Sequence, residues 1–176
     1  MPDTGFDLSN ASNRQLLCLH GDVLAALKQR AVVRTRNAPS ADYAEWLVAD
    51  RLHLTLLGNS HEGYDATDAY NTRYQIKSRW LNTPKALRQL SPIRNLASRL
   101  FDYLIVVLFS SDFGVQEAYQ MPIEVIGDYA RYSKHINGHI LVMKGAILSD
   151  PRVKAIARLL LTDCGVKGGT SLCLAM

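Results

Sequence analysis

The sequence predicts a mixed α/β (α+β) fold in which helices flank one central mixed β-sheet. Apolar residues recur at helical spacing in the first third of the chain, which indicates helices there. Residues 101–110 are almost all β-forming, and such a run is typical of a strand buried on both faces. The order of the predicted elements is helices, then strands, then a last helix. This order is typical of a single sheet whose faces are covered by helices. With 176 residues the chain can bury a full core, so we expect one domain.

Two helices are expected before the strands. The first covers residues 10–33, where apolar side chains recur at helical spacing. The second begins near Ser40 or Asp42, either of which is a suitable cap, and it runs to about Leu54 with Glu45 in its first half. The apolar stripe of the first helix consists of Leu16, Leu17, His20, Val23, Leu24 and Leu27.

A β-hairpin follows, with strands at residues 63–69 and 73–80 and a turn at residues 70–72. Side chains alternate across a strand, so Asp65 and Thr67 share one face of the first strand. By the same rule, Gln75 and Lys77 share one face of the second strand. A three-residue turn sets Asp65 opposite Lys77 and Thr67 opposite Gln75. The pattern therefore predicts that Asp65, Gln75 and Lys77 converge on one patch.

The remaining elements are predicted to be short. A loop or helix at residues 84–100 precedes the buried strand at residues 101–110. A further strand is expected at residues 115–125, and Pro122 pushes its later half towards a sheet edge. After it we expect a helix at residues 126–133, a strand at residues 139–143 and a helix at residues 151–161. Asp150 caps this last helix and Pro151 begins it.

The patch on the hairpin carries the groups that phosphodiester hydrolysis needs. The Asp65 carboxylate can bind Mg²⁺, which prefers oxygen ligands, polarises a phosphate and lowers the pKa of an attacking water. Lys77 suits the stabilisation of developing negative charge, and Glu45 offers a second carboxylate from the preceding helix. Asp68 is the rival for the acidic position. Alternation along the strand places Asp68 on the other face, so it ranks below Asp65. A shift of the strand by one residue would reverse this ranking.

These residues resemble the motif of the PD-(D/E)xK nuclease superfamily, which includes many restriction endonucleases. Its members carry an Asp on one strand and a (D/E)xK sequence on the next, and many place a Glu on the preceding helix. Here residues 63–65 (GYD), residues 75–77 (QIK) and Glu45 match these positions. From about residue 21 to residue 161 the chain also resembles an uncharacterised bacterial family of this superfamily. The matching segments are residues 33–37, 42–45, 74–77 and 101–103.

The resemblance implies a restriction-endonuclease-like core and a Mg²⁺-dependent (or Mn²⁺-dependent) endonuclease that hydrolyses DNA. Asp65, Gln75 and Glu45 would then be the metal ligands, and Lys77 would complete the catalytic set. Duplex DNA is the expected substrate, and a homodimer is expected because cutting two strands requires two sites.

Gln75 departs from the superfamily pattern, because its neutral carbonyl stands where most members have a carboxylate. A catalytically inactive module of the same fold, which binds DNA or a protein in a defence or repair system, is therefore an alternative. An accessory protein without a nucleic-acid role is a third interpretation.

Basic residues flank the motif, and the chain has a formal net charge of +4. Arginine and lysine supply most of the non-specific affinity for nucleic acid, so these residues are candidates for phosphate contacts. For any one of them a solvated surface position is the alternative. Arg79 ranks first because it continues the face of Gln75 and Lys77. The nucleic-acid-binding candidates are Arg79, Arg73, Arg36, Arg34, Lys85 and Arg88.

The expected organisation is an N-terminal helical extension at residues 1–39, a nuclease-like core at residues 40–162 and a flexible tail at residues 163–176. The first residues lack the pattern of a signal peptide, and the longest apolar run is too short to cross a membrane. Together with an odd cysteine number this favours the cytoplasm. Cys18 lies in an apolar stretch and is expected to be buried, whereas Asn137 and Gly138 indicate a turn rather than a metal-binding helix at His135 and His139.

Overall fold

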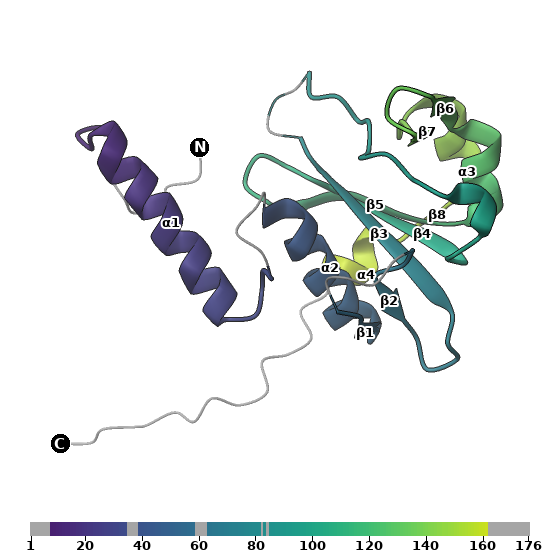
Figure 1. Cartoon of the computed structure of the whole chain (residues 1–176), viewed down its shortest axis with the longest axis horizontal. Helices are drawn as coiled ribbons and strands as arrows, with labels where there is room; N and C mark the ends of the chain where they lie inside the picture. The colour runs from purple at the N-terminus through teal and green to yellow at the C-terminus, as the bar shows by residue number, and fades with distance from the viewer. Residues whose placement is uncertain (1–7, 35–38, 59–62, 82, 84, 162–176) are drawn as a thin grey trace.

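The structure is a computed structural model that describes residues 8–34, 39–58, 63–81, 83 and 85–161. Within these ranges the chain forms a mixed six-stranded sheet flanked by helices (Figure 1), and the predicted α+β class is confirmed. The strands lie in the order β1-β2-β3-β4-β5-β8. Their bounds are β1 Thr55–Leu56, β2 Ala66–Thr67, β3 Arg73–Trp80, β4 Tyr103–Phe109, β5 Val115–Pro122 and β8 Lys154–Ala155.

The two central strands, β3 and β4, run parallel, and the other neighbours in the sheet are antiparallel. Strand β4 lies within the apolar run predicted to be a buried strand, and its residues from Leu104 to Phe109 are fully buried. It pairs with β3 in a register that sets Lys77 beside Val106. Because both faces of β4 are covered, none of its last six positions needs a polar side chain.

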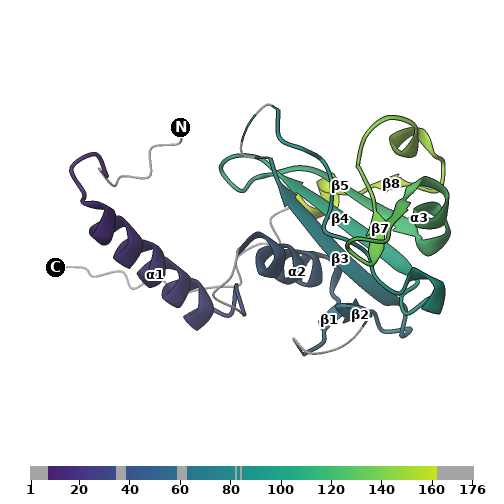
Figure 2. The same cartoon turned by 45° about the horizontal axis from the view of Figure 1, so that its top comes forward.

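Helix α2, Pro39–Leu52, and the short helix α4, Ala157–Leu161, cover one face of the sheet (Figure 2). Consecutive side chains of a strand point to opposite faces of the sheet. Ile76 therefore points toward these helices, whereas Gln75 and Lys77 point away from them. The core cluster on this face consists of Ala44, Leu47, Val48, Ala66, Ile76, Ile105, Val107, Phe109, Ala118, Ile156 and Leu160.

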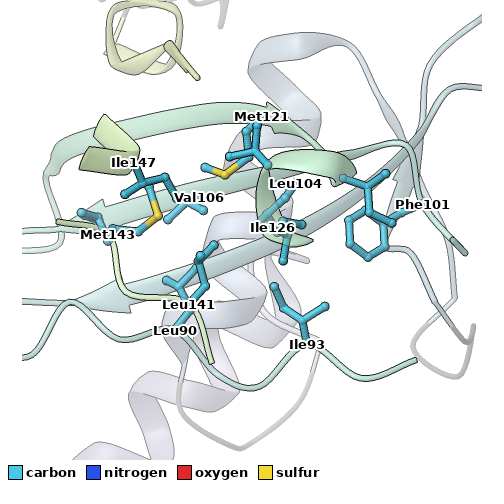
Figure 3. Close-up of a cluster of buried hydrophobic side chains, with 13 residues drawn as sticks. Leu90, Ile93, Phe101, Leu104, Val106, Met121, Ile126, Leu141, Met143 and Ile147 are labelled. Atoms are coloured by element: carbon cyan, nitrogen blue, oxygen red, sulfur yellow. The ribbon is translucent and has the colours of Figure 1, made fainter. Parts of the chain in front are cut away.

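The opposite face carries a second layer whose core includes Leu104 and Val106 of β4 (Figure 3). Isolated bridges join Gln89 to Val142 and Ile93 to His139, which fastens the segment after β3 to this layer. The layer therefore lies over the face that carries Gln75 and Lys77. Its elements are η1 Leu96–Ser98, α3 Ile123–Tyr129, β6 Arg131–Ser133, β7 Gly138–Ile140 and η2 Gly145–Ser149.

Helix α1, Asn13–Gln29, lies beside the sheet and not on it (Figures 1 and 2). A capping box begins the helix, because the hydroxyl of Ser12 accepts the N–H of Gln15 and the Gln15 side chain accepts the N–H of Ser12. Among its described residues only Leu24 is buried, while Leu17 and Val23 are exposed. The helical spacing was predicted correctly, although the helix is shorter at both ends than residues 10–33.

The predicted burial of Cys18 was wrong, because this cysteine is exposed. The apolar stripe around it identifies a helix, but α1 projects from the sheet and finds little core to cover it. Cys164 and Cys173 lie outside the described residues, as does the predicted tail at residues 163–176.

The beginning of α2 also differs from the prediction. The helix starts at Pro39, so Ser40 and Asp42 lie inside its first turn. The Asp42 carboxylate instead accepts the backbone N–H of Arg34 at 2.8 Å. This contact ties the segment after α1 to α2.

Two predictions for the last third of the chain were wrong in detail. Strand β5 ends at Pro122 and α3 starts at Ile123, three residues earlier than expected, because Pro122 is extended and serves as the N-cap position. The expected helix at residues 151–161 is a turn, then β8, then α4. Asp150 does not cap it, because its carboxylate binds the backbone N–H and the guanidinium of Arg152. A turn results, and β8 then pairs with β5.

No helix within the described ranges is both long enough and apolar enough to cross a membrane.

Candidate active site

The hairpin of β2 and β3 brings the predicted motif together. The observed partners are Ala66 with Tyr74 and Thr67 with Arg73, so Asp65, just before β2, lies beside Gln75. We expected Asp65 opposite Lys77, and this register was wrong by two residues. A shift of two conserves the face of every side chain, so the predicted parity holds.

The turn explains the shift. It spans residues 68–72 and not residues 70–72, because the Asp68 carboxylate accepts the backbone N–H groups of Tyr70 and Thr72 at 2.8 and 2.9 Å. Asn71 adopts a positive φ of 61° at the tip. The Tyr74 hydroxyl donates to Asp68 as well. Asp68 therefore stabilises the turn, and its ranking below Asp65 is consistent with this geometry.

Asp65 is fixed across the hairpin by two contacts. Its backbone N–H donates to the carbonyl of Tyr74 at 2.8 Å, and its Oδ2 accepts the backbone N–H of Ile76 at 2.7 Å. Burial raises the pKa of Asp65, and the Ile76 N–H, the Lys77 ammonium and the Arg34 guanidinium oppose this rise. A nearby cation stabilises the ionised form of such a carboxylate and so opposes the effect of burial.

Lys77 lies in the middle of β3 and points into the layer opposite α2. Its Nζ donates to the Ser91 hydroxyl at 3.2 Å. Burial lowers the pKa of Lys77, the Asp65 carboxylate opposes this effect, and the Arg94 guanidinium adds to it. Asp65 and Lys77 are thus a partly buried pair of opposite charge, which is a common feature of catalytic sites.

Gln75 and Lys77 line one cavity of about 320 Å³. The cavity lies between β3 and the segment that follows it, and Gln75 faces it from the position beside Asp65. Its described lining residues are Gly63, Gln75, Lys77, Pro92, Arg94, Asn95, Leu100 and Phe101.

Glu45 is connected to Asp65 through Arg34. The two side chains form an ion pair in which Glu45 is 14% and Arg34 28% exposed. The Arg34 guanidinium also donates to the carbonyl of Leu57 at 2.7 Å, and the Leu57 N–H donates to the carbonyl of Asp65 at 2.9 Å. Glu45 therefore lies at the end of a chain of contacts, and its carboxylate is neutralised by an arginine.

The oxygen donors of the predicted set suit a hard cation. Asp65 supplies a carboxylate and Gln75 an amide carbonyl, both of which bind Mg²⁺ or Mn²⁺. Within the described ranges no group of three or more His, Cys, Asp or Glu side chains is arranged for a metal. The predicted set contains only two such residues, Asp65 and Glu45, so a site here would rely on Gln75 and water for its other ligands.

Three of the predicted phosphate-binding arginines are paired with carboxylates. Besides the pair of Arg34 with Glu45, Arg73 binds Asp102 through two nitrogens at 2.7 and 3.1 Å. Arg88 holds both carboxylate oxygens of Glu117 and also donates to the carbonyl of Met143. These arginines link segments far apart in the chain, so each has a clear role in the fold.

Arg79 and Lys85 are the exposed members of that predicted group. Arg79 continues the face of Lys77, and its Nε donates to the carbonyl of Leu87 at 3.1 Å. Arg36 lies outside the described residues. Within the described ranges, Arg79 and Lys85 are thus the predicted phosphate-binding residues that remain exposed.

The segment after β3 supplies groups that the motif did not identify. Ser91, Pro92 and Arg94 approach Lys77 although they are 14 to 17 positions away. In the sequence, Arg94 is one of several basic residues within the loop or helix predicted at residues 84–100. What sets Arg94 apart is its neighbour Ile93, whose bridge to His139 holds this segment over β3. A contact between such distant residues cannot be predicted from the local sequence.

Comparison with known proteins gives no family for this chain. No protein family model matches the sequence, and no curated protein matches it either.

Proposed function

We propose that this protein is a Mg²⁺-dependent endonuclease that hydrolyses phosphodiester bonds of DNA, with Mn²⁺ as an alternative cofactor. The observation that carries the proposal is the placement of Asp65, Gln75 and Lys77 on one face of the hairpin, where Gln75 and Lys77 line a cavity. Hydrogen bonds to Tyr74 and Ile76 fix Asp65 there. A rigid strand pair is the kind of support that a catalytic set needs.

Asp65 and Gln75 would hold the cation, which when bound polarises the phosphate and lowers the pKa of the attacking water. The chain's own contribution begins with Asp65, whose ionised form balances the cation. Lys77 donates hydrogen bonds, and its positive charge stabilises the phosphate oxygens as negative charge develops on them. Burial strengthens this attraction, because the site around Lys77 is partly shielded from water.

The substrate that we propose is duplex DNA, held by Arg79 and Lys85 in addition to the site itself. Both are exposed, and Arg79 lies on the strand face that continues from Lys77. A homodimer would supply the second site for the second strand. We also propose a cytoplasmic location, which the odd number of cysteines favours.

A catalytically inactive module that binds DNA or a protein is the second candidate. The ion pair between Arg34 and Glu45 favours it, because one of the two predicted acidic ligands is already neutralised. Gln75 also favours the inactive module, because it stands where most members of the PD-(D/E)xK superfamily have a carboxylate. Such a module would bind DNA with a strong salt dependence and without any need for a metal.

Incubation of supercoiled plasmid with the full chain separates these two functions. The endonuclease produces nicked and then linear DNA with Mg²⁺ and none with EDTA. If the plasmid stays supercoiled with Mg²⁺ and with Mn²⁺ while gel-shift assays show salt-sensitive binding, the binding module is correct. If neither cleavage nor binding occurs, both nucleic-acid functions are wrong.

A further inference from the structure

The cavity beside Lys77 contains a second positive charge that the motif does not include. Lys77 forms one wall and Arg94 another. Arg94 is exposed, and it forms no ion pair with any carboxylate in the described part of the chain. No acidic side chain is found among the described residues that line the cavity. Asp65 interacts with Lys77 but does not line the cavity, and Arg94 faces no such carboxylate among the described residues, so the two cations together are suited to an anion.

The position of Arg94 is fixed by the backbone on both sides of it. Ile93 exchanges two hydrogen bonds with His139, of 2.9 and 2.8 Å, and is fully buried. Asn95 follows with a left-handed φ of 51°. Arg94 is therefore attached to a rigid part of the second layer. The backbone that carries this guanidinium therefore needs no rearrangement when the guanidinium binds a phosphate.

Part of the cavity wall is apolar. Pro92, Leu100 and Phe101 form this part of its wall, and Gln75 offers an amide near Lys77. A volume of about 320 Å³ exceeds what one phosphate needs and lies at the lower end of the range for small-molecule sites. A charged end and an apolar end in one cavity fit a nucleotide, with the phosphate at the cations and the sugar and base on the apolar wall.

We infer that this cavity is a subsite for one nucleotide of the substrate, whose phosphate binds between Lys77 and Arg94. The inference rests on the proposed function for its place next to the cleaved bond, but nucleotide binding itself requires neither cleavage nor a metal. Arg94 is then a substrate-binding residue. It also brings a second positive charge near Lys77, and the phosphate relieves the repulsion between the two.

Titration of the full chain with thymidine 5′-monophosphate in EDTA, followed by amide NMR shifts, tests the inference. We expect saturable shifts around residues 75–77 and 92–95. Loss of one charge-assisted contact in Arg94→Ala should weaken binding about tenfold. The matched control is Arg158→Ala, because Arg158 is also exposed but lies on α4, against the opposite face of the sheet. This control should bind as the wild type does.

Two further ligands test the two ends of the cavity. Thymidine should bind more weakly than its monophosphate because it lacks the anion, and inorganic phosphate should bind more weakly because it lacks the apolar part. The inference is overturned if Arg94→Ala binds the monophosphate like the wild type, or if either fragment binds equally well. Nucleotide binding without plasmid cleavage would contradict the proposed endonuclease and leave the subsite in place.

Discussion

The carboxylate of Asp65 accepts the backbone N–H of Ile76 at 2.7 Å, from one strand of the hairpin to the other. This bond uses one carboxylate oxygen for the fold, and the second oxygen accepts no backbone N–H from the described residues. It also aligns Asp65 with the face of β3 that carries Lys77. One residue thus links the register of the hairpin to the chemistry proposed for it.

The first prediction concerns the stability of Asp65→Asn. Burial raises the pKa of Asp65 in the folded protein, so its ionised form costs folding free energy. Stability from this group is fully present below the unfolded pKa and is lost as pH rises through the folded pKa. An amide oxygen still accepts the Ile76 N–H, so we expect Asp65→Asn to gain stability over the wild type as pH rises from about 4 to about 7. Urea unfolding in EDTA measures this difference.

Asp68→Asn is the matched control, and its expected change in folding stability is opposite in sign to that of Asp65→Asn. Slight desolvation acts to raise the pKa of Asp68, but hydrogen bonds from Thr72, Tyr70 and Tyr74 hold it below its usual value. Its contribution is present above the unfolded pKa and is lost as pH falls through the folded pKa. Asp68→Asn should therefore lose stability near neutral pH. Equal effects of the two substitutions would contradict the different environments described for them.

The second prediction concerns Gly63, which lines the cavity with a φ of 103°. A Cβ at this position would lie 2.5 Å from the Cβ of Leu100. Both the backbone conformation and the contact disfavour a side chain, so Gly63→Ala should cost about 1 to 3 kcal/mol of unfolding free energy. Gly58→Ala is the control, because a Cβ there meets nothing within 4 Å. If both variants unfold at the same denaturant concentration, the close packing of Gly63 on Leu100 is wrong.

The third prediction concerns Arg88, which joins Glu117 on β5 to the carbonyl of Met143. Burial, together with the Glu117 carboxylate, raises the pKa of Tyr119 to about 12, so its hydroxyl remains a donor to Glu117. Arg88→Ala leaves the Glu117 carboxylate partly buried without its guanidinium, which should cost about 2 kcal/mol.

Arg79→Ala is the control for this substitution. Arg79 is exposed and should change stability by no more than about 0.5 kcal/mol. In contrast, Arg79→Ala should weaken DNA binding. A stability loss of the same size in both variants would show that Arg88 does not have the structural role assigned to it.

The fourth prediction concerns Arg34, whose guanidinium is paired with Glu45. If Glu45 is a metal ligand, Arg34 competes with the metal for its carboxylate. Arg34→Gln should then lower the Mg²⁺ concentration that gives half-maximal cleavage. Arg51→Gln, on the same helix as Glu45, should leave this concentration unchanged. An unaltered Mg²⁺ dependence in Arg34→Gln would remove Glu45 from the metal site.

Local pattern was sufficient to predict which residues of the hairpin share a face. Alternation along a strand is a property of the backbone, so Asp65, Gln75 and Lys77 remained together even though the register moved by two residues. The apolar run of β4 was equally informative. A strand that is buried on both faces must consist of apolar residues, so the apolar run indicated that this strand lies inside the sheet.

Side-chain contacts at the turns and helix ends were not predictable in the same way. The Asp68 carboxylate lengthens the hairpin turn, and Asp150 binds Arg152 in place of capping a helix. In each case the aspartate side chain binds nearby backbone N–H groups, which competes with regular secondary structure. The Arg34–Glu45 pair and the approach of Arg94 to Lys77 depend on packing between distant segments, for which a single sequence carries no signal.

The fifth prediction tests the central claim, that Asp65 and Lys77 carry Mg²⁺-dependent cleavage of DNA. Plasmid cleavage is measured for the wild type, Asp65→Asn, Lys77→Met and the control Asp68→Asn, each shown to be folded by circular dichroism. The account predicts that the wild type and Asp68→Asn cut with Mg²⁺, while Asp65→Asn and Lys77→Met lose at least about a hundredfold in rate. Cleavage by Asp65→Asn and Lys77→Met at the wild-type rate would contradict it.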